Sequence, residues 1–260
     1  DYLKVTDDKR TIAIADGFGV SSAFKVTQGI FAPWAFYKKD FQEIGGHDTL
    51  FAPQSKEDSD IFNRFQLNGI KFIQTWEGCV YHMTSRGSRF NPNSGGAPGQ
   101  DSPEWLHTTT VNMRNFIRKW GHSVKHDQYL KPIIPSKYDI GLVVYNSNDT
   151  LLKVLEPWCS NTFIDHNGTM YVLNEDKLTS YDIVKRVRGI HEQKYNDIII
   201  EVDGNHFDNE DFRHIQNFAE ILDYDNEIHE EELPCKFQLS HLKITINKLR
   251  TYQNTLIKTI

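Results

Sequence analysis

The sequence predicts an α/β protein built from two units. Its 260 residues suffice for one large or two small domains, and 38% apolar with 25% charged residues is a globular composition. After residue 136, strand-like and helix-like runs alternate, which is typical of a layered α/β structure. The charge balance also changes, from 16 basic and 14 acidic residues in 1–135 to 13 and 21 in 136–260. We therefore expect domains at 1–131 and 136–260, joined at the Pro-rich segment 131–135.

The first unit shows short strands, a few helices and long connections. A brief helix is expected over 39–44, stopped by Gly45-Gly46. Residues 56–68 form the clearest helix, because apolar side chains recur at helical spacing and Asn68-Gly69 ends the run. Strands are expected over 70–75 and 79–82. The segment 85–103 carries four glycines and three prolines and reads as a long loop of the kind that forms lids or binding segments.

A further helix over 102–120 opens with Ser-Pro, which suits a cap and a first helical position. Beyond the linker, the second unit is predicted as strands at 140–145, 162–165 and 197–202, with helices at 150–158, 180–190 and 209–222. Residues 236–247 alternate like strands, and a terminal helix is expected from 249. This unit is a small, acidic α/β domain, and its charge makes it a candidate surface for assembly.

Composition excludes several classes of protein. A net charge of −6 argues against a nucleic-acid partner held by phosphate contacts, and the longest apolar runs are far shorter than the roughly 18 residues of a membrane span. The three cysteines, Cys79, Cys159 and Cys235, are far apart and form no metal or disulfide pattern. We therefore expect a cytoplasmic protein from a reducing compartment.

Acidic residues crowd the start of the helix 56–68, at Glu57, Asp58 and Asp60. The helix dipole favours carboxylates there, which explains such a cluster without any further role. Two carboxylates on one turn also suit a general base and its hydrogen-bonding partner. The sequence alone leaves both interpretations open.

Downstream, His82 precedes Ser85-Arg86-Gly87 in the glycine-rich loop. A neutral imidazole is a ligand for a divalent metal, and the guanidinium of Arg86 suits phosphate. The alternative for His82 is an ordinary hydrogen-bonded histidine. Four aromatic residues nearby are candidates for stacking on a sugar or for core packing: Trp34, Phe36, Trp76 and Tyr81.

Together these motifs resemble one family. Gly45-Gly46-His47-Asp48, the acidic run opening an amphipathic helix, a strand and then His82 occur in the order of the acceptor-side half of family-2-like glycosyltransferases of the A-type nucleotide-sugar fold. The resemblance covers residues 17–89. It implies a partial A-type fold, a mixed sheet with helices, followed by the accessory α/β domain.

The resemblance also implies an activity: transfer of a sugar from a nucleotide-sugar donor to a saccharide or glycan acceptor by an inverting, direct displacement. Asp58 is then the first choice for the catalytic base, with Glu57 beside it, and His82 is a ligand of Mn²⁺ or Mg²⁺. Residues implied to bind substrate are Trp34, Asp48, Asp60, Ser85 and Arg86. For Asp48, capping of the turn after Gly46 is an equal alternative.

The family's nucleotide-binding half, with its Asp-x-Asp motif, is expected before residue 17, where only 16 residues stand and no initiator Met begins the chain. Either that half lies on another segment, which leaves these 260 residues inactive alone, or the chain keeps the scaffold as a non-catalytic carbohydrate- or protein-binding module.

A different interpretation concerns the second unit. There, a strand ends in Tyr145-Asn146 and a later strand ends in Asp203-Gly-Asn205, which loosely resembles the opening strand and metal motif of the same fold. Buried strands often end in acidic or amide residues without any such role. A zinc site from nearby acidic residues and histidines fits no ligand spacing.

Overall fold

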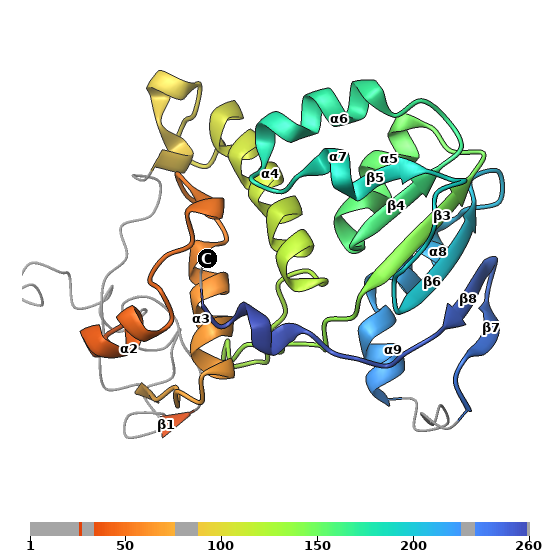
Figure 1. Cartoon of the computed structure of the whole chain (residues 1–260). Coiled ribbons are helices and arrows are strands. Elements are labelled where there is room, and N and C mark those ends of the chain that lie inside the picture. Colours follow the sequence, from red (N-terminus) through yellow and green to blue (C-terminus); the bar gives the residue numbers. More distant parts are fainter. Residues whose placement is uncertain (1–25, 28–33, 76–87, 225–231, 259–260) are drawn as a thin grey trace, which may run out of the picture.

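The computed structural model describes residues 26–27, 34–75, 88–224 and 232–258 (Figure 1). The first half is mainly helical. Its elements are β1 (Val26–Thr27), α2 (Lys38–Glu43), η3 (Thr49–Phe51), α3 (Glu57–Leu67), β2 (Gln74–Thr75), η4 (Ser88–Phe90), η5 (Pro92–Ser94) and α4 (Pro103–Trp120). Strands β1 and β2 pair antiparallel in a two-stranded sheet.

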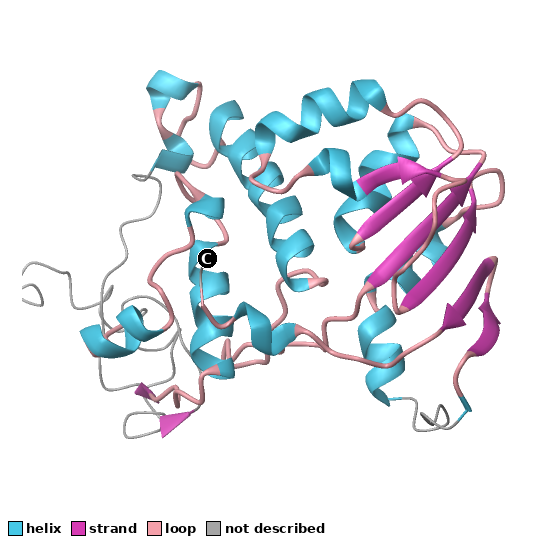
Figure 2. Cartoon of the chain, in the orientation of Figure 1, coloured by secondary structure: helices cyan, strands magenta, loops and turns pink. Residues whose placement is uncertain are grey.

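The second half contains a six-stranded mixed sheet with helices packed on it (Figure 2). Its elements are β3 (Ile140–Tyr145), α5 (Asp149–Leu155), η6 (Glu156–Trp158), β4 (Asn161–Ile164), α6 (Thr169–Glu175), η7 (Asp176–Leu178), α7 (Ile183–Arg186), β5 (Val187–Gly189), β6 (Ile198–Asp203), α8 (Asn209–Gln216), α9 (Phe218–Tyr224), β7 (Cys235–Leu239), β8 (Leu242–Ile246) and η9 (Gln253–Leu256).

The order of strands in this sheet is β5-β4-β3-β6-β8-β7. The first four are parallel, whereas β8 runs antiparallel to β6 and β7 antiparallel to β8. The α/β prediction is therefore confirmed. The mixed sheet, however, lies in the second half, whereas the first unit, where the resemblance implied one, has only the two-stranded β1-β2 sheet among its described residues.

The register places one apolar row across the sheet. Leu142 of β3 is opposite Ile200 of β6, which is opposite Ile244 of β8. All three side chains are at most 1% exposed and belong to the largest buried cluster, which also contains Leu152 of α5. Burial of such side chains contributes about 1.5–3 kcal/mol each.

Helix α4 packs with both halves of the chain. Its Ile117 joins the large cluster beside the sheet, while Phe116 and Trp120 form a smaller cluster with Phe51. A buried ion-pair network adds to this contact, because Arg118 of α4 pairs with Glu156 of η6. The helix therefore connects the first half to the sheet. The linker expected at 131–135 follows the end of this helix.

Several predicted elements agree closely with the structure, and some do not. The strand expected at 140–145 and the helices expected at 56–68 and 102–120 are found within two residues of those bounds. The single helix expected over 180–190 is wrong, because α7 ends at Arg186 and the chain continues as strand β5. The strand expected over 70–75 is only Gln74–Thr75, and 79–82 lies outside the described residues.

No helix in the described part of the chain combines the length and the apolar character that a bilayer crossing requires.

Candidate functional site

The order of the parallel strands indicates at which edge of the sheet a ligand would bind. From β3 the chain moves outward to β4 and β5, and then returns to place β6 on the other side of β3. The direction of winding thus reverses between β3 and β6. In open α/β sheets, ligands bind outside the carboxyl ends of the strands at such a switch point.

Polar residues follow β3 and β6 at this position. The two strands end side by side, with Tyr145 opposite Asp203, and the Asn146 side chain donates a hydrogen bond of 2.8 Å to Asp203. Asn146 has a left-handed backbone, with φ of 51°. A Cβ on Gly204 would lie 2.5 Å from the Asn146 carbonyl oxygen, so the close approach of the two strand ends requires glycine.

The neighbouring strand β4 adds a second carboxylate. Asp165, directly after β4, accepts hydrogen bonds from the backbone N–H groups of Asn146 at 2.6 Å and Ser147 at 2.9 Å. The Ser147 hydroxyl is also 2.6 Å from an Asp165 oxygen. The ends of β4, β3 and β6 are therefore held together by one hydrogen-bonded group, Asn146, Ser147, Asp165 and Asp203, which we call the switch-point cluster.

Both carboxylates in the cluster are stabilised in their charged form. Hydrogen bonds from the Asn146 side chain, the Asn205 backbone and His206 lower the pKa of Asp203 to about 2. Partial burial alone raises the pKa of Asp165, but the hydrogen bonds from Ser147 and Asn146 outweigh it and lower that pKa. At neutral pH the edge therefore presents two ionised, solvent-facing carboxylates.

Imidazoles flank the switch-point cluster on both sides. His166 lies 2.6 Å from the Ser147 hydroxyl through Nδ1 and 3.0 Å from Asp149 through Nε2. His206 Nδ1 lies 2.8 Å from Asp203. Carboxylate oxygens are ligands that suit Mn²⁺ or Mg²⁺, whereas imidazole nitrogens are more typical of metals such as Zn²⁺.

A second group of metal-type ligands lies close by. Asp208, Asp211 and His241 each offer one ligand atom, all within 4.8 Å of one another. The His241 ring centroid is 6.5 Å from that of His206. However, Asp208 and Asp211 form the capping box of α8, and Asp211 also accepts a hydrogen bond from the His241 backbone. These carboxylates therefore already stabilise the start of the helix.

The residues expected to carry catalysis, Glu57 and Asp58, lie on the first turn of α3. Asp58 is exposed, and Glu57 is half-buried with its Oε2 buried and unpaired among the described residues. The two residues before them, Ser55 and Lys56, both have left-handed backbones, with φ of 80° and 74°. Such conformations are costly for residues other than glycine and are common at functional turns.

Asp60 and Asp48 have their contacts inside the fold. Asp60 is fully buried and accepts hydrogen bonds from Arg64 at 2.8 Å and Trp120 at 2.9 Å, with Lys119 Nζ 2.6 Å away. Asp48 caps η3 through Leu50 N–H and pairs with Lys119 at 2.7 Å. Both carboxylates therefore attach η3 and α3 to α4.

Trp34 is half-buried among aromatic rings, with centroids 4.8 Å from Phe36 and 5.3 Å from Phe62. His82, Ser85 and Arg86 lie outside the described residues. The predicted site is thus described only in its Trp34, Asp48 and α3 portions.

The predicted site and the switch-point cluster are far apart. Figure 1 shows α3 on one side of the molecule, the carboxyl ends of β3 and β6 on the other, and α4 between them. Sequence reasoning noted Asn146 and Asp203 as a secondary possibility and missed Ser147, Asp165 and His166. The available signal was a polar group directly after each buried strand.

The chain was compared with protein-family models, curated proteins and solved structures, and none of them matches.

Proposed function

We propose that this chain is a glycosyltransferase that binds a nucleotide-sugar donor, together with Mn²⁺ or Mg²⁺, at the switch-point cluster. One observation carries the proposal: the four parallel strands have the order of a doubly wound nucleotide-binding unit, and ionised carboxylates follow both β4 and β6 at its switch point. The resemblance of residues 17–89 to the acceptor-side half of A-type glycosyltransferases supports it independently.

Each residue of the cluster has a proposed role. Asp203 and His206 would hold the divalent metal, whose chemistry is to stabilise negative charge on the departing diphosphate. Asp165, with lone pairs beyond those used by Asn146 and Ser147, would accept hydrogen bonds from the ribose hydroxyls or the base. The carboxylate oxygens of Asp203 fit a hard cation.

The first turn of α3 carries the base that the resemblance implies, Asp58, with Glu57 beside it. A base can act only on an acceptor hydroxyl that lies next to the donor sugar. Because α3 and the switch-point cluster lie on opposite sides of the molecule, Asp58 takes no part in transfer from a donor held at that cluster, and we propose that α3 belongs to a separate site. In the family the nucleotide-binding half precedes the acceptor-side half, whereas here the order is reversed.

Binding of the donor product is the sharpest test, because it needs only the switch-point cluster. We expect isothermal titration with UDP and with GDP, each with and without MnCl₂, to show metal-dependent binding of at least one of them. Asp203→Asn should abolish this binding. Asp182→Asn is the matched control, since Asp182 is also an exposed, hydrogen-bonded carboxylate but caps α7.

Two results would contradict the proposal. The first is no binding of either nucleotide by a folded wild-type protein, and the second is equal binding by Asp203→Asn. Glycan binding without any metal dependence would instead favour the non-catalytic carbohydrate-binding module.

A further inference from the structure

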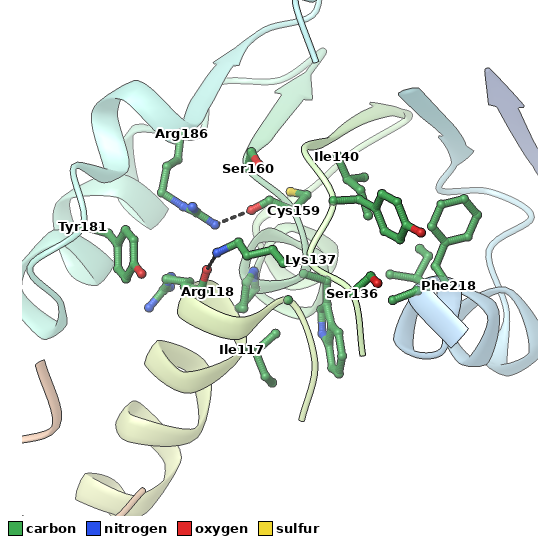
Figure 3. Close-up of a pocket in the computed structure, with 16 residues that line it drawn as sticks. Ile117, Arg118, Ser136, Lys137, Ile140, Cys159, Ser160, Tyr181, Arg186 and Phe218 are labelled. Atoms are coloured by element: carbon green, nitrogen blue, oxygen red, sulfur yellow. Dashed lines mark hydrogen bonds between the residues drawn. The ribbon is translucent and has the colours of Figure 1, made fainter. Parts of the chain in front are cut away.

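A cavity of about 90 Å³ lies at the opposite edge of the sheet, beside the amino ends of β3 and β4 (Figure 3). It is enclosed by the end of α4, the chain entering β3, the turn before β4, the region of α7, and helices α8 and α9. Its lining includes Arg118, Lys137, Trp158, Arg186 and Phe218. The proposed nucleotide site uses none of them.

Cationic groups converge on one end of this cavity. Lys137 Nζ donates to the carbonyl oxygens of Arg118, at 3.0 Å, and Lys119. An ammonium has three donors, so one remains beyond these two. Arg186 donates through Nε and Nη2 to Glu156 and Cys159, and its Nη1 makes no hydrogen bond among the described residues. Figure 3 shows the Lys137 ammonium between the Arg118 carbonyl and the Arg186 guanidinium.

The charges around this end do not balance. Three arginines, Arg114, Arg118 and Arg186, share the carboxylates of Glu156 and Glu175. Lys137 contacts only backbone carbonyls among the described residues, and Asp139 is the one carboxylate that acts on it. A buried ammonium without a direct counter-ion is unfavourable, and either loss of its proton or a bound anion relieves that cost.

The cavity also has apolar lining. Ile117, Pro157, Trp158, Ile215 and Phe218 line it, and each offers a hydrocarbon or ring surface. A ligand that fits this lining as well as the cations therefore combines an anionic group with a small apolar part.

We propose that this cavity binds a small organic anion, whose carboxylate or phosphate group contacts Lys137 and Arg186 and whose apolar part packs on Trp158 and Phe218. The site is independent of the proposed nucleotide site, because it occupies the other edge of the sheet. Its occupation would neutralise the charge at the junction between α4 and the sheet.

The ionisation of Lys137 provides a direct readout. Burial lowers the pKa of Lys137 to about 7, and the cations Arg186 and Lys119 act in the same direction. A bound anion favours the charged ammonium, so it should raise this pKa. The other ionisable groups close to Lys137 or at the same end of the cavity are Arg118, Asp139, Glu156, Cys159 and Tyr181.

The experiment uses acetate, benzoate and inorganic phosphate as probes at pH 6.5 and constant ionic strength. We expect at least one probe to raise the melting temperature saturably, with benzoate stronger than acetate because of the apolar lining. Lys137→Met should abolish the effect. Lys125→Met should retain it, because Lys125 pairs with Glu220 and does not line the cavity.

Since Lys137 also binds the last carbonyls of α4, its replacement can destabilise the fold. A second measurement therefore uses the wild-type protein, with ¹³Cε-labelled lysine followed by NMR. The Lys137 titration should move to higher pH when the probe is saturating. The proposal is overturned if no probe stabilises the protein saturably, if Lys137→Met responds like the wild type, or if the Lys137 titration is unchanged by all three probes.

Discussion

Replacement of Glu156 by Gln tests the network that connects α4 to the sheet. The Glu156 carboxylate is fully buried and accepts hydrogen bonds from Arg118 at 2.6 Å, Arg186 at 2.5 Å and the Tyr171 hydroxyl at 2.8 Å. The variant keeps the shape of the side chain but leaves two buried guanidinium groups without this negative charge. Loss of one partner of a buried ion pair costs about 3–5 kcal/mol.

The pKa of Glu156 gives a similar magnitude. Burial alone raises that pKa, but Arg186 and Arg118 outweigh burial and hold it at about 2, below the ordinary 4.5. A shift of this size corresponds to about 3 kcal/mol of folding free energy. Because the pKa is lowered in the folded state, this contribution is present above pH 4.5 and is lost as the pH falls toward 2.

The assay is urea denaturation of wild type and Glu156→Gln at pH 7 and again at pH 3. We expect the free energy of unfolding of the variant to be lower by about 3 kcal/mol at pH 7, with a smaller difference at pH 3. Glu210→Gln is the control, since Glu210 is exposed on α8. A difference under about 0.5 kcal/mol at pH 7, the usual effect of a surface substitution, would show that the Glu156 charge does not hold α4 to the sheet.

Three further predictions follow from the site and the core. Asp58→Asn should leave nucleotide binding at the switch-point cluster unchanged in titration calorimetry, because α3 lies on the opposite side of the molecule; weaker binding would contradict two separate sites. Gly204→Ala should weaken nucleotide binding and lower stability, because the new Cβ meets the Asn146 carbonyl oxygen at 2.5 Å; unchanged binding would show that the strand ends tolerate separation. Burial lowers the pKa of His122 to about 4. The free energy of unfolding of the wild type should therefore fall by about 3 kcal/mol between pH 6.5 and pH 4, because the unfolded state binds a proton there and the folded state does not. Denaturation curves measured across that range should show no such fall for His122→Phe.

Local sequence predicted the elements whose own pattern is decisive. The continuous apolar run over 140–145 gave strand β3, and the acidic first turn with Asn68-Gly69 gave α3. Strand β5 was missed because Val187 becomes a strand residue by pairing with Thr162 of β4, a contact that the local pattern does not contain. Tertiary pairing overrides local propensity in such short segments.

The candidate site was harder to predict for the same reason. Asn146 and Asp203 become neighbours only through the parallel register of β3 and β6, and Asp165 joins them through β4. Asp60 is the opposite case. Its position in an acidic run predicted a substrate-binding role, whereas in the structure it is buried and accepts hydrogen bonds from Arg64 and Trp120.

The central claim is that nucleotide and metal bind at the carboxyl ends of β3, β4 and β6. Paramagnetic broadening by Mn²⁺ of assigned amide resonances, recorded with UDP or GDP, locates the metal directly. The account predicts that broadening is strongest at Asn146, Asp165 and Asp203 and absent from α3. Broadening centred on the first turn of α3, or on Asp211 and His241 rather than Asp203, would contradict it.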